Sequence, residues 1–138
     1  MAEENDRYPR WQKIAIDQFG YALNLTLTFT IATLGYCFAL MKDNGFVPVS
    51  SAKCAMTLSL LALALSAVSG FTCVVNRLWD FKGTAKRARN DARAPSDDAL
   101  DKMGKRTWIL FYVQLGTFVT GLVALAVTLL LTYGYKLI

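Results

Sequence analysis

Residues 55–89 read AMTLSLLALALSAVSGFTCVVNRLWDFKGTAKRAR, an apolar run that passes without interruption into a basic segment. The first part, Ala55 to Val75, holds no charged side chain and is long enough to cross the hydrocarbon core of a bilayer as a helix. The second part is rich in lysine and arginine, which suits water and lipid head groups. This junction predicts a membrane helix that continues beyond the bilayer.

The chain carries three apolar blocks of this kind. Its 138 residues are enough for one domain, and 54% of them are hydrophobic. Each block is longer than the ~18 residues that a membrane helix needs, and none shows the polar face of a soluble core helix. We therefore predict an all-α, polytopic membrane protein with a single domain, residues 1–138. The predicted transmembrane helices are at about 17–41, 52–76 and 107–133, and the second and third extend into a cytoplasmic helical hairpin at about 77–106.

Lysine and arginine are unevenly distributed between the predicted loops. Three precede the first membrane helix, two lie in the first loop, nine in the second loop and one in the tail. Because basic loops stay in the cytoplasm, the second loop is predicted to be cytoplasmic. The N-terminus, two crossings away, is then also cytoplasmic, and the C-terminus lies outside. The expected location is the cell's inner (cytoplasmic) membrane, crossed several times.

Two of the predicted helices carry small side chains at four-residue spacing. Such faces let neighbouring backbones approach closely in a membrane. We predict that the two faces pack against each other. The helix-packing residues are Ala62, Ser66 and Gly70 on the second helix and Gly116, Thr120 and Ala124 on the third, where the spacing continues to Thr128 and Thr132.

Polar side chains also recur within the apolar blocks. Asn24, Thr28 and Gly35 share one face of the first predicted helix, and a second face carries three threonines. Such stripes contact neighbouring helices or line a wet cavity, and packing is the favoured interpretation. If the protein forms a pore, its candidate lining residues are Asn24, Thr26, Thr30, Thr33 and Gln114.

The basic segment forms a stripe along one face of the predicted hairpin. Its cations can set membrane orientation, grip anionic lipid head groups, or bind an acidic partner, a nucleotide or nucleic acid. Nucleic acid is not favoured, because the chain has no glycine loop that could cradle a phosphate and no set of aromatic residues for base stacking. The candidate residues for lipid or partner contact are Arg77, Lys82, Lys86, Arg87, Arg89 and Arg93.

Several chemistries are not indicated by the composition. Histidine is absent, which removes the commonest metal ligand and the commonest general base. The three cysteines, Cys37, Cys54 and Cys73, lie in or beside apolar blocks with no pairing pattern. We therefore expect a protein that is not an enzyme and that uses neither a cofactor nor a metal.

The segment from Asn76 to Arg89 resembles the SLATT group, small bacterial two-helix membrane proteins proposed as pore-forming effectors in nucleotide-signalled phage defence. The likeness rests on a Thr-Ala-basic-x-x-Arg pattern, here Thr84 to Arg89, close to Arg77-Leu78. In this chain the basic segment precedes the last helix and there is one additional helix, so no functional residue is carried over. The resemblance implies a bacterial host and a pore-forming role.

Two functional hypotheses follow. The first is a homo-oligomer that forms a pore or perturbs the membrane, as a defence-type effector does. The alternative is an accessory or scaffold subunit of a larger membrane complex, which docks through its basic hairpin. A solute transporter is less favoured, because the sequence shows no internal repeat.

Overall fold

The computed structural model describes residues 2–89 and 96–134, and within these ranges it contains α-helices and no strand. The described part has three helices: α1 (Ala2–Lys42), α2 (Ser50–Ala88) and α3 (Asp97–Tyr133). All three contain segments that are long and apolar enough to cross a membrane, which confirms the predicted all-helical, multi-pass architecture. Helix α2 continues well past its apolar run, and α3 begins before its own. That this extension is cytoplasmic stays a prediction.

A short connection reverses the chain between α1 and α2. The backbone N–H of Asp43 donates to the carbonyls of Ala39 and Leu40, which ends α1. The Asp43 carboxylate then accepts a hydrogen bond of 3.0 Å from the N–H of Gly45, a side-chain turn that orders the loop. Since so few residues separate the two helices, α1 and α2 run antiparallel as neighbours.

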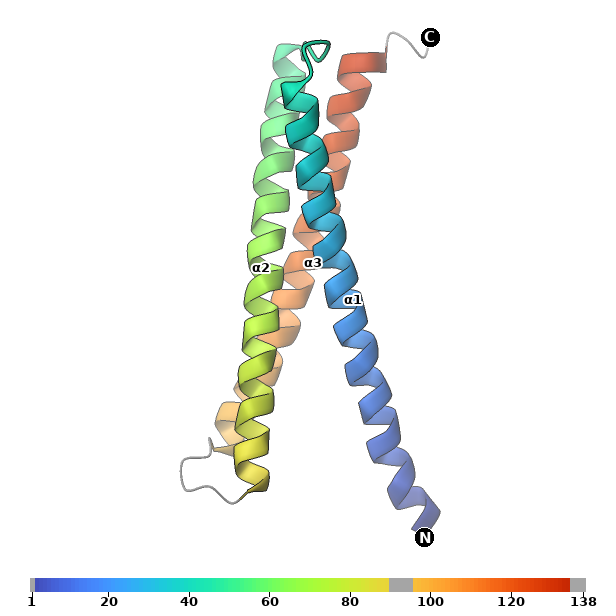
Figure 1. The fold of residues 1–138 in the computed structure, drawn as a ribbon, viewed down its shortest axis with the longest axis vertical. Helices are drawn as coiled ribbons and strands as arrows, with labels where there is room; N and C mark the ends of the chain where they lie inside the picture. Colours follow the sequence, from blue (N-terminus) through green and yellow to red (C-terminus); the bar gives the residue numbers. More distant parts are fainter. Residues whose placement is uncertain (1, 90–95, 135–138) are drawn as a thin grey trace.

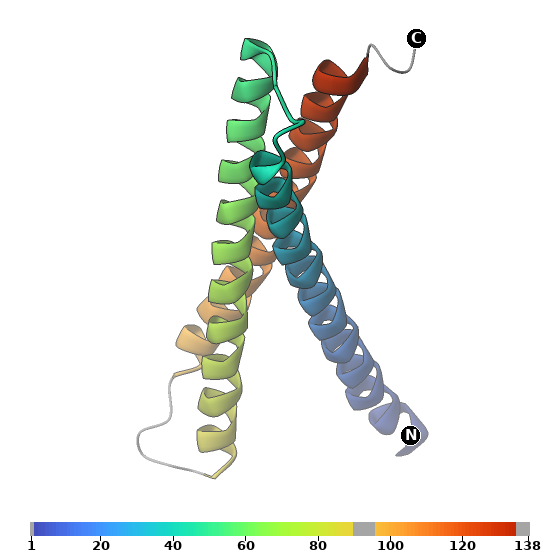
Figure 2. The ribbon, with the colours of Figure 1, turned by 45° about the horizontal axis from the view of Figure 1, so that its top comes forward.

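The two views of the ribbon show how the helices are arranged (Figures 1 and 2). Helices α2 and α3 lie side by side along most of their length. Helix α1 lies against this pair near its own C-terminal end and diverges from it toward its N-terminal end. Helix α1 begins at one end of the assembly and α3 finishes at the other, as three successive crossings require.

The buried side chains recur every seven residues on each helix. This spacing is that of left-handed coiled-coil packing, in which each side chain fits between residues of the facing helix. The buried residues at seven-residue intervals are Leu23, Thr30 and Cys37 on α1; Ala52, Ser59, Ser66 and Cys73 on α2; and Thr107, Gln114, Gly121 and Thr128 on α3.

The distribution of polarity is the reverse of that in a soluble protein. Hydroxyl-bearing and amide side chains are buried between the helices, whereas large apolar side chains such as Leu61, Phe71 and Ile109 are at least 62% exposed. In water such an apolar surface would be strongly unfavourable, but lipid tails solvate it as well as a protein core does. The fold is therefore that of a helical membrane protein whose outer surface faces lipid.

Candidate functional site

Hydrogen bonds from serine hydroxyls to backbone carbonyls join α2 to α3. Ser59 Oγ donates to the carbonyl of Gly121 at 2.8 Å, and Ser66 Oγ donates to the carbonyl of Gln114 at 2.9 Å. A serine side chain is short, so these bonds require the two backbones to lie close together. We call this contact the α2–α3 seam.

The seam continues to the level where the apolar run of α2 ends. There the side-chain amide of Asn76 donates to the carbonyl of Met103 at 3.1 Å and to the hydroxyl of Thr107 at 2.7 Å. The thiol of Cys73 donates to the carbonyl of Thr107 at 3.4 Å. No role was predicted for these residues from the sequence, although an asparagine at the end of an apolar run signals an interhelical hydrogen bond.

Polar groups of α1 also meet the middle of the seam. The hydroxyl of Thr30 lies 3.4 Å from that of Ser66, and both side chains are fully buried. Thr30 also donates to the carbonyl of Thr26 within its own helix. One level of the bundle therefore places hydroxyl groups of α1 and α2 beside the backbone of α3.

The amide of Gln114 is buried in the seam and has no hydrogen-bond partner among the described residues. The residue is fully buried, and neither its Nε2 nor its Oε1 is paired within that part of the chain. Gly70 provides the space that it occupies, because a Cβ placed at Gly70 would lie 2.5 Å from Gln114 Nε2. Leaving a buried amide unpaired costs ~1–3 kcal/mol, so this position is not optimised for stability.

The predicted packing residues divide between the seam and the outer surface. Ala62, Ser66, Gly70 and Ala124 are buried, whereas Gly116 and Thr120 are exposed. A four-residue spacing advances ~40° around a helix at each step, so a long stripe of this kind leaves the contact face. A seven-residue spacing stays on it, which is why Thr107, Gln114, Gly121 and Thr128 are all buried; Ala124, Leu125 and Thr132 are buried beside them.

The candidate pore-lining residues lie mostly inside the bundle. Thr30 and Gln114 are fully buried between helices. Thr26 and Thr33 are partly buried, and their hydroxyls donate to carbonyls of their own helix. Asn24 alone of this set is exposed.

Arg77 joins α2 to α1 at the end of the apolar run. Its Nη2 donates to the carbonyl of Ile16 at 2.6 Å, and its guanidinium carbon lies 5.2 Å from the ring centre of Phe19 and 5.4 Å from that of Phe81. A guanidinium between two aromatic rings gains cation–π attraction at both faces. Gly20 permits this approach, since a Cβ there would lie 2.8 Å from Arg77 Nη1.

An aromatic cluster extends this contact to α3. The ring of Phe19 lies 4.8 Å from that of Trp108 and 4.9 Å from that of Phe111. Trp108 and Trp79 are more than half exposed, as expected of anchors at a membrane–water interface. Arg77 and the two tryptophans thus indicate the depth of the lipid head groups.

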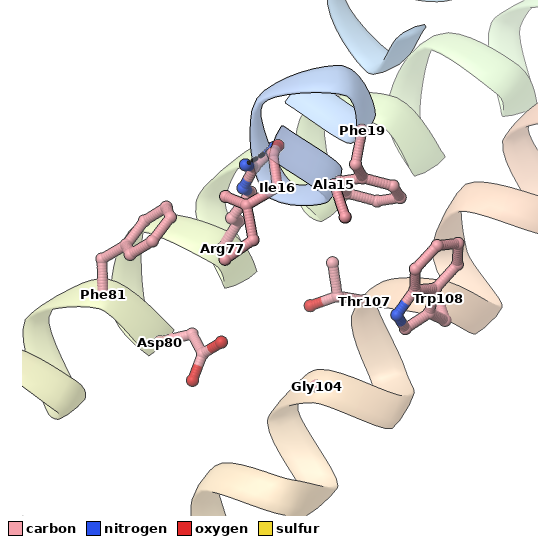
Figure 3. Close-up of a pocket in the computed structure, with 9 residues that line it drawn as sticks. All are labelled: Ala15, Ile16, Phe19, Arg77, Asp80, Phe81, Gly104, Thr107 and Trp108. Atoms are coloured by element: carbon pink, nitrogen blue, oxygen red, sulfur yellow. Dashed lines mark hydrogen bonds between the residues drawn. The ribbon is translucent and has the colours of Figure 1, made fainter. Parts of the chain in front are cut away.

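Beneath Arg77 is a cavity of about 250 Å³ bounded by all three helices (Figure 3). Its walls are predominantly apolar, with one cationic and one anionic side chain. The lining residues are Ala15, Ile16, Phe19, Arg77, Asp80, Phe81, Gly104, Thr107 and Trp108.

Further along α2, the basic stripe surrounds a hollow on the outer surface. Lys82, Lys86 and Arg89 are exposed and border this hollow together with Ala85. The Arg87 side chain and the whole of Arg93 lie outside the described part of the structure. Arg77 stands apart from the stripe because it is partly buried against α1.

The described ranges contain neither a candidate metal site nor a disulfide. They contain no group of three or more metal-ligating side chains. Cys37, Cys54 and Cys73 are free, and the first and last of these are buried. Cys37 and Cys73 contribute to helix packing as small apolar side chains do, whereas Cys54 is exposed.

The fold and the polar interior define a class, the small multi-pass helical membrane proteins. Comparison with protein-family models, with curated proteins and with solved structures finds no match to this chain. Any statement about its activity therefore depends on its own residues.

Proposed function

We propose that this protein is a non-enzymatic membrane protein that acts as a homo-oligomer, in which copies meet along the Asn24 face of α1. Asn24 is the observation that supports the proposal. Its carboxamide is exposed within a segment that is apolar enough to span a membrane, and no hydrogen bond to that amide occurs among the described residues. Thr28 and Gly35 are exposed on the same stripe.

An unpaired amide facing lipid is unfavourable, and pairing with another helix relieves the cost. Hydrogen bonds between membrane helices contribute roughly 0.6–2 kcal/mol each, and an asparagine amide offers both donors and an acceptor. A second Asn24 is a matching partner, since an amide can donate to and accept from its own kind. The hydroxyl of Thr28 already has a partner, because it donates to the backbone carbonyl of Asn24 at 2.8 Å. The Asn24 side chain therefore remains the group that needs a partner.

The oligomer is proposed to perturb the membrane, as a defence-type bacterial effector would. The polar interior of one chain is filled by its own helices, so conduction would take place between copies. Asn24 and Thr28 would then be the residues in contact with the permeating ions. The proposed location is the inner membrane, with the Arg77 end of the bundle in the cytoplasm.

Native mass measurement after gentle solubilisation tests the oligomer, with Asn24→Leu as the critical variant. We expect the wild-type protein to run as a single homo-oligomer and Asn24→Leu to shift it toward the monomer by about tenfold in dissociation constant. Phe29→Leu is the control, because Phe29 is exposed on the same helix outside the Asn24 stripe. A monomeric wild-type protein would refute the proposal, as would an unchanged mass for Asn24→Leu.

A second candidate is an accessory subunit that docks an acidic partner on the basic stripe. Lys82, Lys86 and Arg89 have no acidic partner among the described residues, so they are available for such a contact. Reversing the charge of Lys86 and Arg89 together should then release a co-purifying larger chain. Loss of that chain without any change in homo-oligomer mass would favour this candidate over the first.

A further inference from the structure

We infer that the cavity beneath Arg77 is a binding site for one phospholipid whose head group carries both a phosphate and a primary ammonium, as phosphatidylethanolamine does. The cavity combines three properties that such a lipid requires. It lies at head-group depth, its walls are predominantly apolar, and it presents one cation and one anion. The inference does not depend on the proposed oligomer.

The two charged side chains of the cavity do not form an ion pair with each other. Within the described residues, neither Arg77 nor Asp80 takes part in an ion pair. Arg77 uses one N–H on the carbonyl of Ile16 and holds its guanidinium between two aromatic rings, which fixes its position while leaving other N–H groups. Figure 3 shows Arg77 reaching toward Ile16 of α1, while Asp80 lies on the side toward Gly104 of α3.

This separation of charge matches a zwitterionic head group. The lipid phosphate would accept from Arg77, and the terminal ammonium would donate to Asp80. A glycerol head group would offer the Asp80 carboxylate only neutral hydroxyl donors, whose hydrogen bonds are weaker than that of an ammonium. A choline head group would leave it without a donor, because a quaternary ammonium has no N–H. The same geometry therefore disfavours both other common classes of head group.

Gly104 keeps the cavity open. A Cβ placed at this position meets no atom within 4 Å, although α1 and α2 both border the cavity. A larger side chain at residue 104 would extend from a Cβ that meets no neighbour into the space proposed for the lipid. Gly104→Leu thus blocks the site while leaving Arg77 and Asp80 in place.

Native mass spectrometry of the solubilised chain tests the site, with ethanolamine, glycerol and choline phospholipids of identical acyl chains supplied in equal amounts. We expect the wild-type protein to retain one ethanolamine lipid with about tenfold preference over either competitor, the value of one charge-assisted hydrogen bond. Asp80→Asn should reduce that preference to less than twofold. Gly104→Leu should lose the bound lipid, and Ala126→Leu, which introduces the same side chain at an exposed position of α3, should retain it.

Three results would overturn the inference. Equal retention of all three lipids by the wild-type protein would show that lipid covers this surface without selection of the head group. An unchanged preference in Asp80→Asn would show that the carboxylate takes no part in recognition. Because Asp80→Asn leaves the helix packing intact, this variant still tests the inference if Gly104→Leu fails to fold. Displacement of the lipid by water-soluble glycerophosphoethanolamine at millimolar concentration would assign the site to a free phosphate compound instead.

Discussion

The contact between helices α2 and α3 differs in kind from the contact that α1 makes with the two of them. The seam between α2 and α3 buries small and hydroxyl-bearing side chains at every seven-residue step and is bridged by serine hydroxyls bonded to backbone carbonyls. Helix α1 is held at its Arg77 end by one long cationic side chain and a cluster of rings.

The difference shows two solutions to one problem. Lipid tails are as apolar as leucine, so burial of apolar surface does not drive membrane helices together. The seam relies on close backbone approach, which loses stability as soon as bulk is added. At its Arg77 end, α1 relies on a few directed interactions, which can be removed one at a time while the α2–α3 pair stays folded. Nearer its C-terminus, α1 also buries Leu23, Thr30 and Cys37 against the pair.

The largest effect is expected for Gly121→Ile in the seam. A Cβ at Gly121 would lie 2.7 Å from Leu63 Cγ and 3.3 Å from the backbone N of Leu63, and the backbone cannot move aside. We expect a loss of about 3 kcal/mol in the free energy of unfolding, measured by titrating detergent-solubilised protein with a denaturing detergent. Gly116→Ile is the matched control, because a Cβ there meets no atom within 4 Å. Equal losses in the two variants would contradict the observed seam.

Gln114→Met should change stability in the opposite direction. Methionine has a similar length and flexibility but carries no amide, so it removes the two buried atoms that lack partners. The expected gain is about 1–2 kcal/mol in the same titration. Destabilisation of comparable size would mean that the Gln114 amide is hydrogen-bonded in the membrane, and the comparison of the two contacts would have to be revised.

Arg77→Leu should loosen α1 alone. The change removes the hydrogen bond to Ile16 and both cation–π contacts, together worth about 1–2 kcal/mol. Spin labels at the exposed positions Tyr21 and Leu78 should then report a longer and broader distance. Lys82→Leu, which removes an exposed cation of α2, serves as the control and should leave the distance unchanged.

The smallest effect is expected for Ser59→Ala. It deletes one hydrogen bond across the seam, to the carbonyl of Gly121, and should cost about 0.6 kcal/mol. Thr57→Ala is the control, since that hydroxyl is exposed and bonds the carbonyl of Lys53 in its own helix. A loss for Ser59→Ala no larger than that for Thr57→Ala would show that the seam is held by packing alone.

The sequence was sufficient to predict the membrane helices and insufficient to predict which face of each helix is buried. Hydropathy is a local property, so three apolar blocks predict three spans without knowledge of the neighbours. Packing faces depend on the partner. Small residues at four-residue spacing drew attention to Gly116 and Thr120, which are exposed, whereas Gly121 lies in the seam.

The candidate site was accessible to sequence reasoning only in part. Arg77 was recognised as a candidate for head-group contact from its position at the end of an apolar run. That Arg77 reaches Ile16, which is distant in the sequence, depends on how α1 crosses the other two helices, and no local pattern contains this information. The space beside Gly104 is likewise a property of three helices together.

The fit of Gln114 beside Gly70 also determines how α2 and α3 are aligned lengthwise. Antiparallel helices with a seven-residue repeat can slide by one repeat and still bury equivalent faces. Such a slip would bring Gln114 opposite Leu63 or Arg77, where no glycine leaves room for it. An awkward polar residue at a single core position is a known means of fixing the register of paired helices at some cost in stability. The unpaired amide would thus select one lengthwise register of α2 against α3.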